Sequence, residues 1–116
     1  MHELSVTKNI FAIVQKHAIK NGVKKVHVVN LEIGALSDLQ NEWIQRYFDY
    51  LSKGSVADGA RLCIRRVPAV FECYQCMERF EMETLLKGEL ICKYCHSNNI
   101  SLISGKEYTV INMEAE

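Results

Sequence analysis

Four cysteines constrain this chain more than any other feature of its sequence. Cys73 and Cys76 form one Cys-x-x-Cys pair, and Cys92 and Cys95 form a second pair after fifteen intervening residues. Each pair turns two thiolates toward one point, and two pairs at this separation are typical of a zinc site. Four thiolates leave zinc no open position for a substrate, so the spacing predicts a structural site. The ligand type alone also leaves iron open, as in a rubredoxin-like centre.

The composition indicates the compartment in which these cysteines would work. The chain is 48% hydrophobic and 24% charged, as is ordinary for a globular protein. It has no apolar run long enough to span a bilayer and no secretory signal pattern. We therefore expect a cytoplasmic protein without a membrane role, whose cysteines stay reduced and favour metal over disulfides. We interpret the fifth cysteine, Cys63, as a small buried apolar side chain.

Two helices and three strands are predicted outside the cysteine region. The first helix spans residues 5–21, with Ser5 as its cap, and residues 26–33 form a strand. The second helix begins in a capping box from Ser37 to Gln40 and ends at Lys53 and Gly54. Strands follow at 61–65 and 106–113. The predicted apolar faces consist of Val6, Ile10, Ile13, Val14 and His17 in the first helix and Trp43, Ile44, Tyr47, Phe48 and Leu51 in the second.

These elements predict an α+β fold with two helices packed on a small three-stranded sheet. The only proline, Pro68, marks a boundary near residue 69, so residues 1–69 form one lobe. Residues 70–103 then form an inserted zinc-ribbon-like lobe, and the returning segment 104–116 completes the first lobe. We expect the last strand to pair with the strand at 60–67. Too few apolar side chains lie in the inserted lobe for it to fold without metal, namely Phe71, Phe80, Leu90 and Ile91.

The N-terminus offers an unusual set of nitrogen ligands. The amine of Met1, the backbone amide of His2 and the imidazole of His2 can chelate one metal ion, and the amide of Glu3 can complete a square plane. Square-planar nitrogen ligation selects Ni(II) or Cu(II). Taken alone the pattern is weak, because most histidines at position 2 have no such role. His96, directly after Cys95, is similarly open to interpretation as a surface side chain or as an alternative ligand that couples two metals.

The motifs of several enzyme and binding classes are missing. The chain has no phosphate-binding Gly-x-x-x-x-Gly-Lys-Ser/Thr loop, no Gly-x-Ser-x-Gly elbow and no His-x-Glu before the cysteine pairs. We therefore do not expect an enzyme. Lys+Arg and Asp+Glu balance at 14 each, which argues against a nucleic-acid partner. A zinc-ribbon interaction or nucleic-acid-binding module without nickel is the alternative.

Taken together, the motifs resemble the HypA/HybF family of hydrogenase maturation nickel metallochaperones. The resemblance covers the whole chain and rests on Met1–Glu3, Leu31–Ser37, Gly54–Ala60, the cysteine pairs with His96, Gly105–Glu107 and the acidic C-terminus. It differs at Lys93, where many members have proline after the third cysteine, and a looser second knuckle is the expected consequence.

The resemblance implies a function for both candidate metal sites. His2 and the backbone nitrogens of Met1 and Glu3 would hold Ni(II), with Glu3 as a positioning residue or amide ligand, and the four cysteines would hold Zn(II). His96 matches a histidine implicated in metal coupling in some members. Nickel would pass to the large subunit of [NiFe]-hydrogenase with help from a hydrogenase maturation GTPase. In some bacteria such proteins also serve urease, with its accessory proteins as partners.

Overall fold

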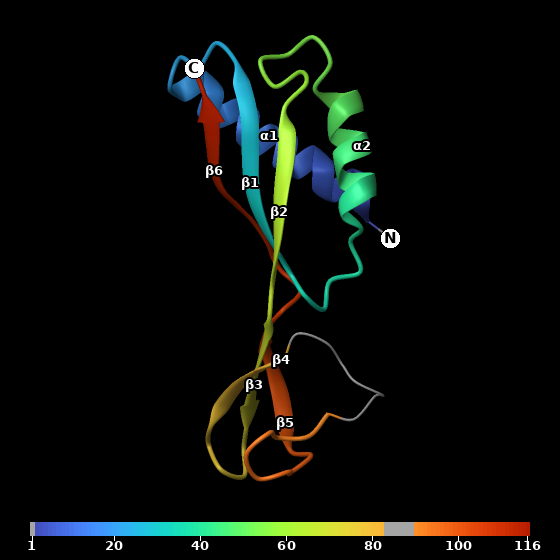
Figure 1. Cartoon of the computed structure of the whole chain (residues 1–116), viewed down its shortest axis with the longest axis vertical. Helices are drawn as coiled ribbons and strands as arrows, with labels where there is room; N and C mark the ends of the chain where they lie inside the picture. The colour runs from blue at the N-terminus through green and yellow to red at the C-terminus, as the bar shows by residue number, and fades with distance from the viewer. Residues whose placement is uncertain (1, 83–89) are drawn as a thin grey trace. The chain divides into compact units, whose positions relative to one another are not determined.

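The structure is a computed structural model that describes residues 2–82 and 90–116. The described strands form two sheets, one ordered β2-β1-β6 and one ordered β4-β3-β5 (Figure 1). The elements are α1 (Glu3–Lys20), β1 (Val26–Gly34), α2 (Asn41–Leu51), β2 (Arg61–Val67), β3 (Ala69–Cys73), β4 (Arg79–Met82), β5 (Ile100–Ser104) and β6 (Tyr108–Ala115). This arrangement confirms the predicted α+β class with a zinc-ribbon-like part.

The chain divides into two compact units. The helical unit comprises Met1–Glu32, Asp38–Arg65 and Thr109–Glu116, and the cysteine unit comprises Ile33–Ser37 and Arg66–Tyr108. Each unit has a buried apolar cluster of its own. The lobes predicted from the sequence, 1–69 with 104–116 and 70–103, stay a prediction. Within the described ranges, no helix is long and apolar enough to cross a membrane.

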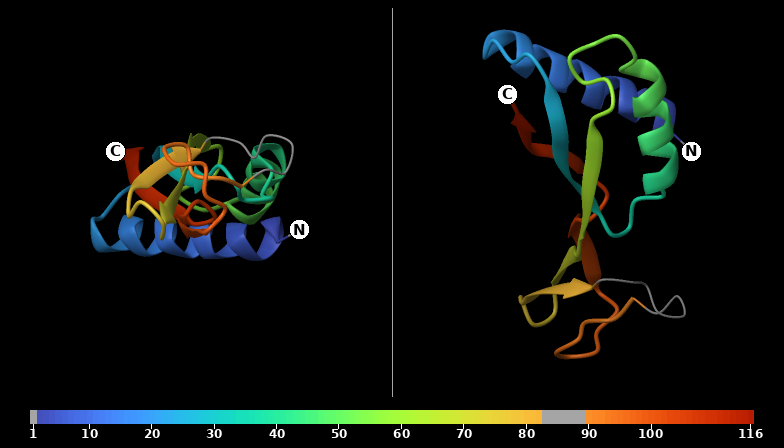
Figure 2. Two further views of the ribbon diagram at one scale, coloured as in Figure 1. Left: turned by 90° about the horizontal axis from the view of Figure 1, so that it is seen from below. Right: turned by 45° about the horizontal axis from the view of Figure 1, so that its top comes forward.

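In the helical unit, α1 lies across one face of the strands and α2 packs against α1 beside β2 (Figure 1 and Figure 2). The rings of Phe11 and Phe48 meet edge to face, with centroids 5.9 Å apart. The core of this unit contains Ile10, Val14, Ala18, Val26, Val29, Leu31, Ile44 and Phe48, all at most 1% exposed. Burial of these apolar side chains is what holds the helices on the sheet.

The predicted pairing of the last strand is wrong. We expected β6 to pair with β2, but β1 lies between them in the sheet. The physical reason is burial: β1 buries Val26, Val29 and Leu31, whereas β6 buries none of its residues. The central strand β1 has a neighbour on each side and a helix over one face. A strand in that position is buried, so it needs such an apolar sequence. The strands β3, β4 and β5 and the four cysteines still follow β2 and precede β6 in the chain, and β2 and β6 belong to one sheet.

The first helix begins two residues before the predicted start. His2 takes the N-cap position of α1, and the hydroxyl of Ser5 donates to the His2 carbonyl at 3.1 Å instead of capping the helix. The buried face also differs, because it contains Glu3 and Thr7 in line with Ile10, Val14 and Ala18. Two members of the predicted face lie outside it: Ile13 is 37% exposed, and His17, expected in the core, is exposed.

The second helix begins at Asn41, directly after the predicted capping box of Ser37 to Gln40. The N–H of Ser37 donates to the carbonyl of Gly34 at 3.0 Å and closes a turn before the helix. The N-cap is Gln40, which makes no side-chain capping bond. Of the predicted apolar face, Ile44 and Phe48 are buried, Tyr47 and Leu51 are half-buried and Trp43 is 41% exposed.

The cysteine unit is built on the sheet β4-β3-β5. Phe71 of β3 lies opposite Phe80 of β4, and their rings stack with centroids 5.8 Å apart. These two residues pack with Ala69, Cys73 and Cys92 into one buried cluster. The predicted core members Phe71 and Phe80 are therefore confirmed. Ile91 is half-buried, and Leu90 is 39% exposed, which corrects its predicted place in the core.

The end of β1 belongs to the cysteine unit because three backbone segments meet there. The N–H of Gly34 donates to the carbonyl of Glu107 at 2.8 Å, and the N–H of Leu36 donates to that of Gly105 at 2.9 Å. A Cβ atom on Gly34 would lie 2.0 Å from the Gly105 carbonyl oxygen, so only glycine fits this approach. Leu36 then packs against the buried cluster of this unit.

The carboxylate of Glu107 closes the turn at this junction. It accepts the N–H of Gly105 at 3.0 Å and that of Lys106 at 3.1 Å. These two backbone hydrogen bonds lower the pKa of Glu107. The stabilisation is therefore present above the ordinary pKa of a glutamate and is lost as the pH falls through the lowered value. This role accounts for Glu107, whose side chain accepts both bonds.

Candidate metal centres

The fold brings the four predicted cysteines together. Their Sγ atoms all lie within 4.8 Å of one another. The Cys73–Cys95 and Cys76–Cys92 pairs have Sγ atoms 3.6 Å apart. Four sulfurs at about 2.3 Å from zinc in a tetrahedron are about 3.8 Å apart, so the cluster fits a closed Zn(II) site. Among the residues 2–82 and 90–116, this is the only group of three or more His, Cys, Asp or Glu with such a geometry.

The two cysteine pairs have the same local geometry. In the first, the N–H of Gln75 donates to Cys73 Sγ at 3.3 Å and the N–H of Met77 donates to the Cys73 carbonyl at 3.0 Å. In the second, Tyr94 and His96 make the same bonds to Cys92, at 3.3 and 2.9 Å. Backbone donors to sulfur stabilise a thiolate, the form that binds metal.

Lys93 lies within the second turn, and the turn still makes these same hydrogen bonds. The Nζ of Lys93 lies 5.7 Å from the centroid of the Tyr94 ring. A cationic side chain over an aromatic face is a favourable contact. The hydrogen bonds of the second pair are as short as those of the first, so the looser second knuckle expected from Lys93 is not seen in them.

The thiols of the cluster have divergent pKa values. Burial raises the pKa of Cys92, but the backbone N–H groups of Cys95 and Tyr94 outweigh it and lower the pKa to about 7. For Cys76 the backbone hydrogen bond from Glu78 acts in the lowering direction, but burial and the neighbouring sulfurs raise the pKa to about 12. Because protons and a metal ion compete for the same sulfurs, metal affinity of this cluster must fall as the pH falls.

A residue in the left-handed conformation follows each cysteine pair. Met77 has φ 65° and His96 has φ 63°, so each pair closes on a non-glycine residue with positive φ. Histidine tolerates this region better than methionine does. His96 thus has a backbone role that the sequence did not reveal, and its side chain is exposed. The predicted role of His96 in metal coupling stays a prediction.

We expect Met77→Gly to stabilise the cysteine unit by about 1 kcal/mol, because glycine adopts positive φ without the clash that a side chain meets. Met77 is 70% exposed, so its removal uncovers little core. The measurement is the denaturant midpoint of the zinc-loaded protein. Gln75→Gly, at an exposed position without a positive φ, is the control and should destabilise the unit. An unchanged or lowered midpoint for Met77→Gly would contradict strain at this position.

The second candidate site lies at the N-terminus. His2 is exposed at the N-cap of α1, with φ −130° and ψ 23°. Met1, the first predicted nickel ligand, lies outside the described residues. A hollow of about 380 Å³ lies beside the terminus and is lined by His2, Glu3, Leu4, Ser5, Lys8 and Tyr47.

Glu3 is buried, with 5% of its surface exposed. Its Oε2 accepts the backbone N–H of Gln40 at 3.2 Å, at the N-terminus of α2. Its carbonyl accepts the hydroxyl of Thr7. An anionic side chain at a helix N-terminus is stabilised by the helix dipole and by the free N–H groups there. The side chain of Glu3 therefore links the start of α1 to the start of α2.

This contact was not predicted from the sequence, although the spacing of Glu3, Thr7 and Ile10 places them on one helix face. Gln40 takes part through its backbone N–H, so the type of its side chain does not indicate the contact. Cys63, predicted to be buried, is exposed on the edge strand β2. His27 is exposed, with Nε2 3.3 Å from the Glu116 carboxylate. Neither lies in the metal cluster.

Comparison with known proteins finds matches along nearly the whole chain. Residues 1–115 match a family model described as "Hydrogenase/urease nickel incorporation, metallochaperone, hypA". A hydrogenase maturation factor HypA from Trichodesmium erythraeum is 37% identical, with 100% of this chain and 96% of the relative covered. HybF from Salmonella typhimurium is 34% identical, with both chains fully covered. The solution structure of the Ni metallochaperone HypA from Helicobacter pylori is similar, with a TM-score of 0.71, 29% identity and coverage of 99% of this chain and 97% of that one.

Proposed function

The chain belongs to the HypA family of hydrogenase and urease nickel-incorporation metallochaperones, and on this premise we propose that it carries one Ni²⁺ at its own N-terminus. The family consists of nickel metallochaperones for hydrogenase maturation and not of enzymes. Nickel is thus the cargo of this protein. The donors that we propose are the Met1 amine, the His2 amide and imidazole and the Glu3 amide.

The observation that carries the proposal is the position of His2 at the N-cap of α1. The first four N–H groups of a helix have no acceptor within it, and here they belong to His2, Glu3, Leu4 and Ser5. The intrahelical bonds begin at Val6, whose N–H donates to the His2 carbonyl at 3.0 Å. Nickel can therefore replace the amide protons of His2 and Glu3 without breaking a helix hydrogen bond.

The burial of Glu3 supports a backbone role for it in nickel binding. Its carboxylate is committed to the Gln40 N–H, 3.2 Å away. We propose that this contact fixes the first turn of α1 so that the two amides and the His2 imidazole can converge on one ion. Glu3 is then a positioning residue through its side chain and a ligand through its amide nitrogen. Prepositioned ligands lower the ordering cost of binding.

We propose Zn(II) as the ion held by Cys73, Cys76, Cys92 and Cys95, with a structural role. The sulfur distances suit it, and the cysteine unit has a small buried cluster. The imidazole of His96 is exposed next to Cys95, which suits a role in coupling the two metals. We also propose the division into a nickel-binding lobe at 1–69 with 104–116 and a zinc-binding lobe at 70–103.

The proposed recipient is the [NiFe]-hydrogenase large subunit in the cytoplasm. Delivery would require a hydrogenase maturation GTPase, because this chain has no phosphate-binding loop of its own. Urease accessory proteins are proposed as further partners, since the family description names urease. An exposed chelate at a chain end suits transfer, because its ligands can be exchanged one at a time.

A Gly-Ser extension before Met1 is expected to abolish stoichiometric nickel binding, because it moves the free amine away from His2. The same extension after Glu116 should leave one Ni²⁺ per chain. Calorimetric titration of zinc-loaded protein measures both. Equal binding by the two extended chains would place nickel elsewhere in the molecule and refute the N-terminal site.

A further inference from the structure

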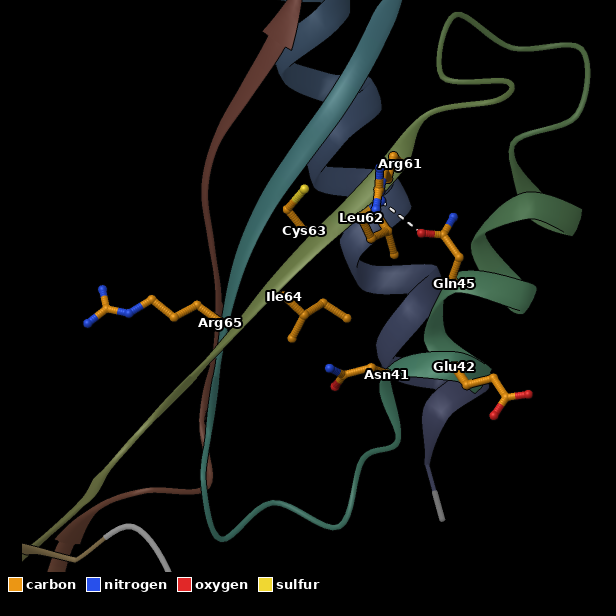
Figure 3. A pocket seen from close by; sticks show the side chains of 8 residues that line it. All are labelled: Asn41, Glu42, Gln45, Arg61, Leu62, Cys63, Ile64 and Arg65. Atoms are coloured by element: carbon orange, nitrogen blue, oxygen red, sulfur yellow. Dashed lines mark hydrogen bonds between the residues drawn. The ribbon is translucent and has the colours of Figure 1, made fainter.

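A groove of about 550 Å³ lies between α2 and the outer edge of β2 (Figure 3). We call it the β2 groove; it is lined by Asn41, Glu42, Gln45 and the strand residues Arg61–Arg65. All of these residues belong to the helical unit. Among the described strands, β1 is the only neighbour of β2, so β2 lies at the edge of the sheet.

Gln45 already occupies part of this edge as a neighbouring strand would. Its Oε1 accepts the N–H of Leu62 at 2.8 Å, and its Nε2 donates to the carbonyl of Ala60 at 3.3 Å (Figure 3). The backbone of Leu62 therefore points outward. Because a strand repeats every two residues, the N–H and carbonyl of Ile64 point outward too. Among the residues that the structure describes, none forms a hydrogen bond with Ile64 on that side.

Three charged side chains line the β2 groove, namely Glu42, Arg61 and Arg65. Glu42 is bound to Arg46 at 2.8 Å and points away from β2 (Figure 3). Glu32 is bound to Arg65 at 3.0 Å in an exposed pair, which contributes little and can exchange partners at small cost. The guanidinium of Arg61 forms no hydrogen bond or ion pair with any residue in the described ranges.

The two faces of β2 define the sequence that would fit beside it. Arg61, Cys63 and Arg65 alternate with Leu62 and Ile64, and Ile64 points toward α2 while Arg65 points away (Figure 3). A strand added at this edge would place alternate side chains next to each set. A second copy of β2 would bring its arginines against Arg61 and Arg65, and like charges at an edge oppose such pairing.

We propose that the outer edge of β2 binds an extended acidic segment of a partner protein as a fourth strand of the sheet. Its main chain would bond the Ile64 N–H and carbonyl, and its acidic side chains would lie beside Arg61 and Arg65. Its intervening apolar side chains would face Leu62 and Ile64. Main-chain bonds supply affinity in this mode of recognition, and alternate side chains supply specificity. This surface is independent of nickel and holds whether or not the N-terminal site does.

The direct test uses the zinc-loaded full chain and the blocked peptide acetyl-Ser-Glu-Val-Ser-Val-Glu-Ser-amide. Its pattern is the same in both directions, so it fits a parallel or an antiparallel strand. We expect the backbone amide signal of Ile64 to shift most in the proton–nitrogen NMR spectrum. A peptide with lysine in place of both glutamates should bind at least about tenfold more weakly. No shift at Ile64 with the glutamate peptide, or equal binding of both peptides, would overturn the proposal.

Two variants separate the backbone contact from the charge contact. Ile64→Pro removes the outward N–H, which an edge strand tolerates, and should abolish binding. Ile64→Ala removes only the side chain, so it should keep main-chain binding. Arg61→Glu should reverse the peptide preference, while Lys53→Glu, the same charge change on an exposed residue outside the groove, should not. Retained zinc and a dispersed spectrum show that each variant is folded.

Other outcomes count against the proposed partner. Binding by Ile64→Pro equal to that of Ile64→Ala would exclude strand addition. Concentration-dependent shifts at Ile64 without any peptide, together with a dimer in sedimentation, would show that the edge pairs with a second copy. That result would overturn the acidic partner.

Discussion

Cys92→Ala is expected to unfold the cysteine unit while the helical unit stays folded. Cys92 is fully buried, belongs to the same cluster as Phe71 and Phe80, and supplies one of four sulfurs. Structural zinc contributes on the order of 10–16 kcal/mol to folding in small zinc peptides, far more than this small cluster can replace. We expect zinc to be lost and the NMR signals of β3, β4 and β5 to collapse to unfolded positions.

Cys63→Ala is the matched control, because Cys63 is the cysteine that lies outside the cluster and is exposed. It should keep one zinc per chain and an unchanged spectrum. A Cys92→Ala protein that retained stoichiometric zinc and dispersed signals for β3–β5 would show that the unit folds without the metal. The collapse of α1 and α2 in that variant would show that the two units do not fold independently.

His2→Ala is expected to lower nickel affinity by at least about a hundredfold, with zinc content and stability unchanged. The variant loses the imidazole, and with it one chelate ring. The backbone amide at position 2 remains in the variant. The side chain of His2 is exposed, so its removal should leave the fold unchanged. Nickel binding displaces protons from its nitrogen ligands, so nickel affinity should also fall as the pH falls.

His17→Ala is the control for this substitution, because His17 is also exposed and lies near the other end of α1. Calorimetry should give one Ni²⁺ per chain for His17→Ala. Equal affinity in both variants would keep nickel binding but remove it from the N-terminus, and His96 would then be the next ligand to test.

The cysteine cluster was predictable from the sequence because its spacing is a local property of the chain. Two Cys-x-x-Cys turns need only a sheet of suitable size to bring their sulfurs together, and β3, β4 and β5 provide it. The existence of both helices and of the strands at β1, β2 and β6 was predictable for the same reason, since each has its own apolar period.

The strand order and the role of Glu3 were not predictable in this way. Periodicity identifies β2 and β6 as strands but does not say which edge of β1 each one takes. The burial of Glu3 depends on the N–H of Gln40, a backbone group 37 residues away in the chain. The predicted helix starts were wrong because Ser5 lies inside α1, where its hydroxyl donates to the His2 carbonyl, and because the N-cap of α2 is Gln40 and not Ser37.

The exposure of Cys63 follows from the same limitation. In an alternating strand, the side chains of one face are buried and those of the other are open to solvent. The sequence Arg61–Arg65 does not show which face is open, nor that β2 lies at an edge of the sheet. Leu62 is the residue that turns inward, and Cys63 turns outward with its arginine neighbours. A cysteine between two arginines is, in retrospect, on their face of the strand.

The most direct test of nickel at the N-terminus is the proton–nitrogen NMR spectrum of the zinc-loaded chain, with a native Met1 amine, before and after one equivalent of Ni²⁺. Square-planar Ni(II) with nitrogen ligands is diamagnetic, so we predict sharp lines throughout. The amide signal of Glu3 should disappear because its proton is displaced, and shifts should be confined to the first turn of α1. Paramagnetic broadening, or shifts centred on residues 73–96 with an intact Glu3 amide, would contradict the N-terminal site.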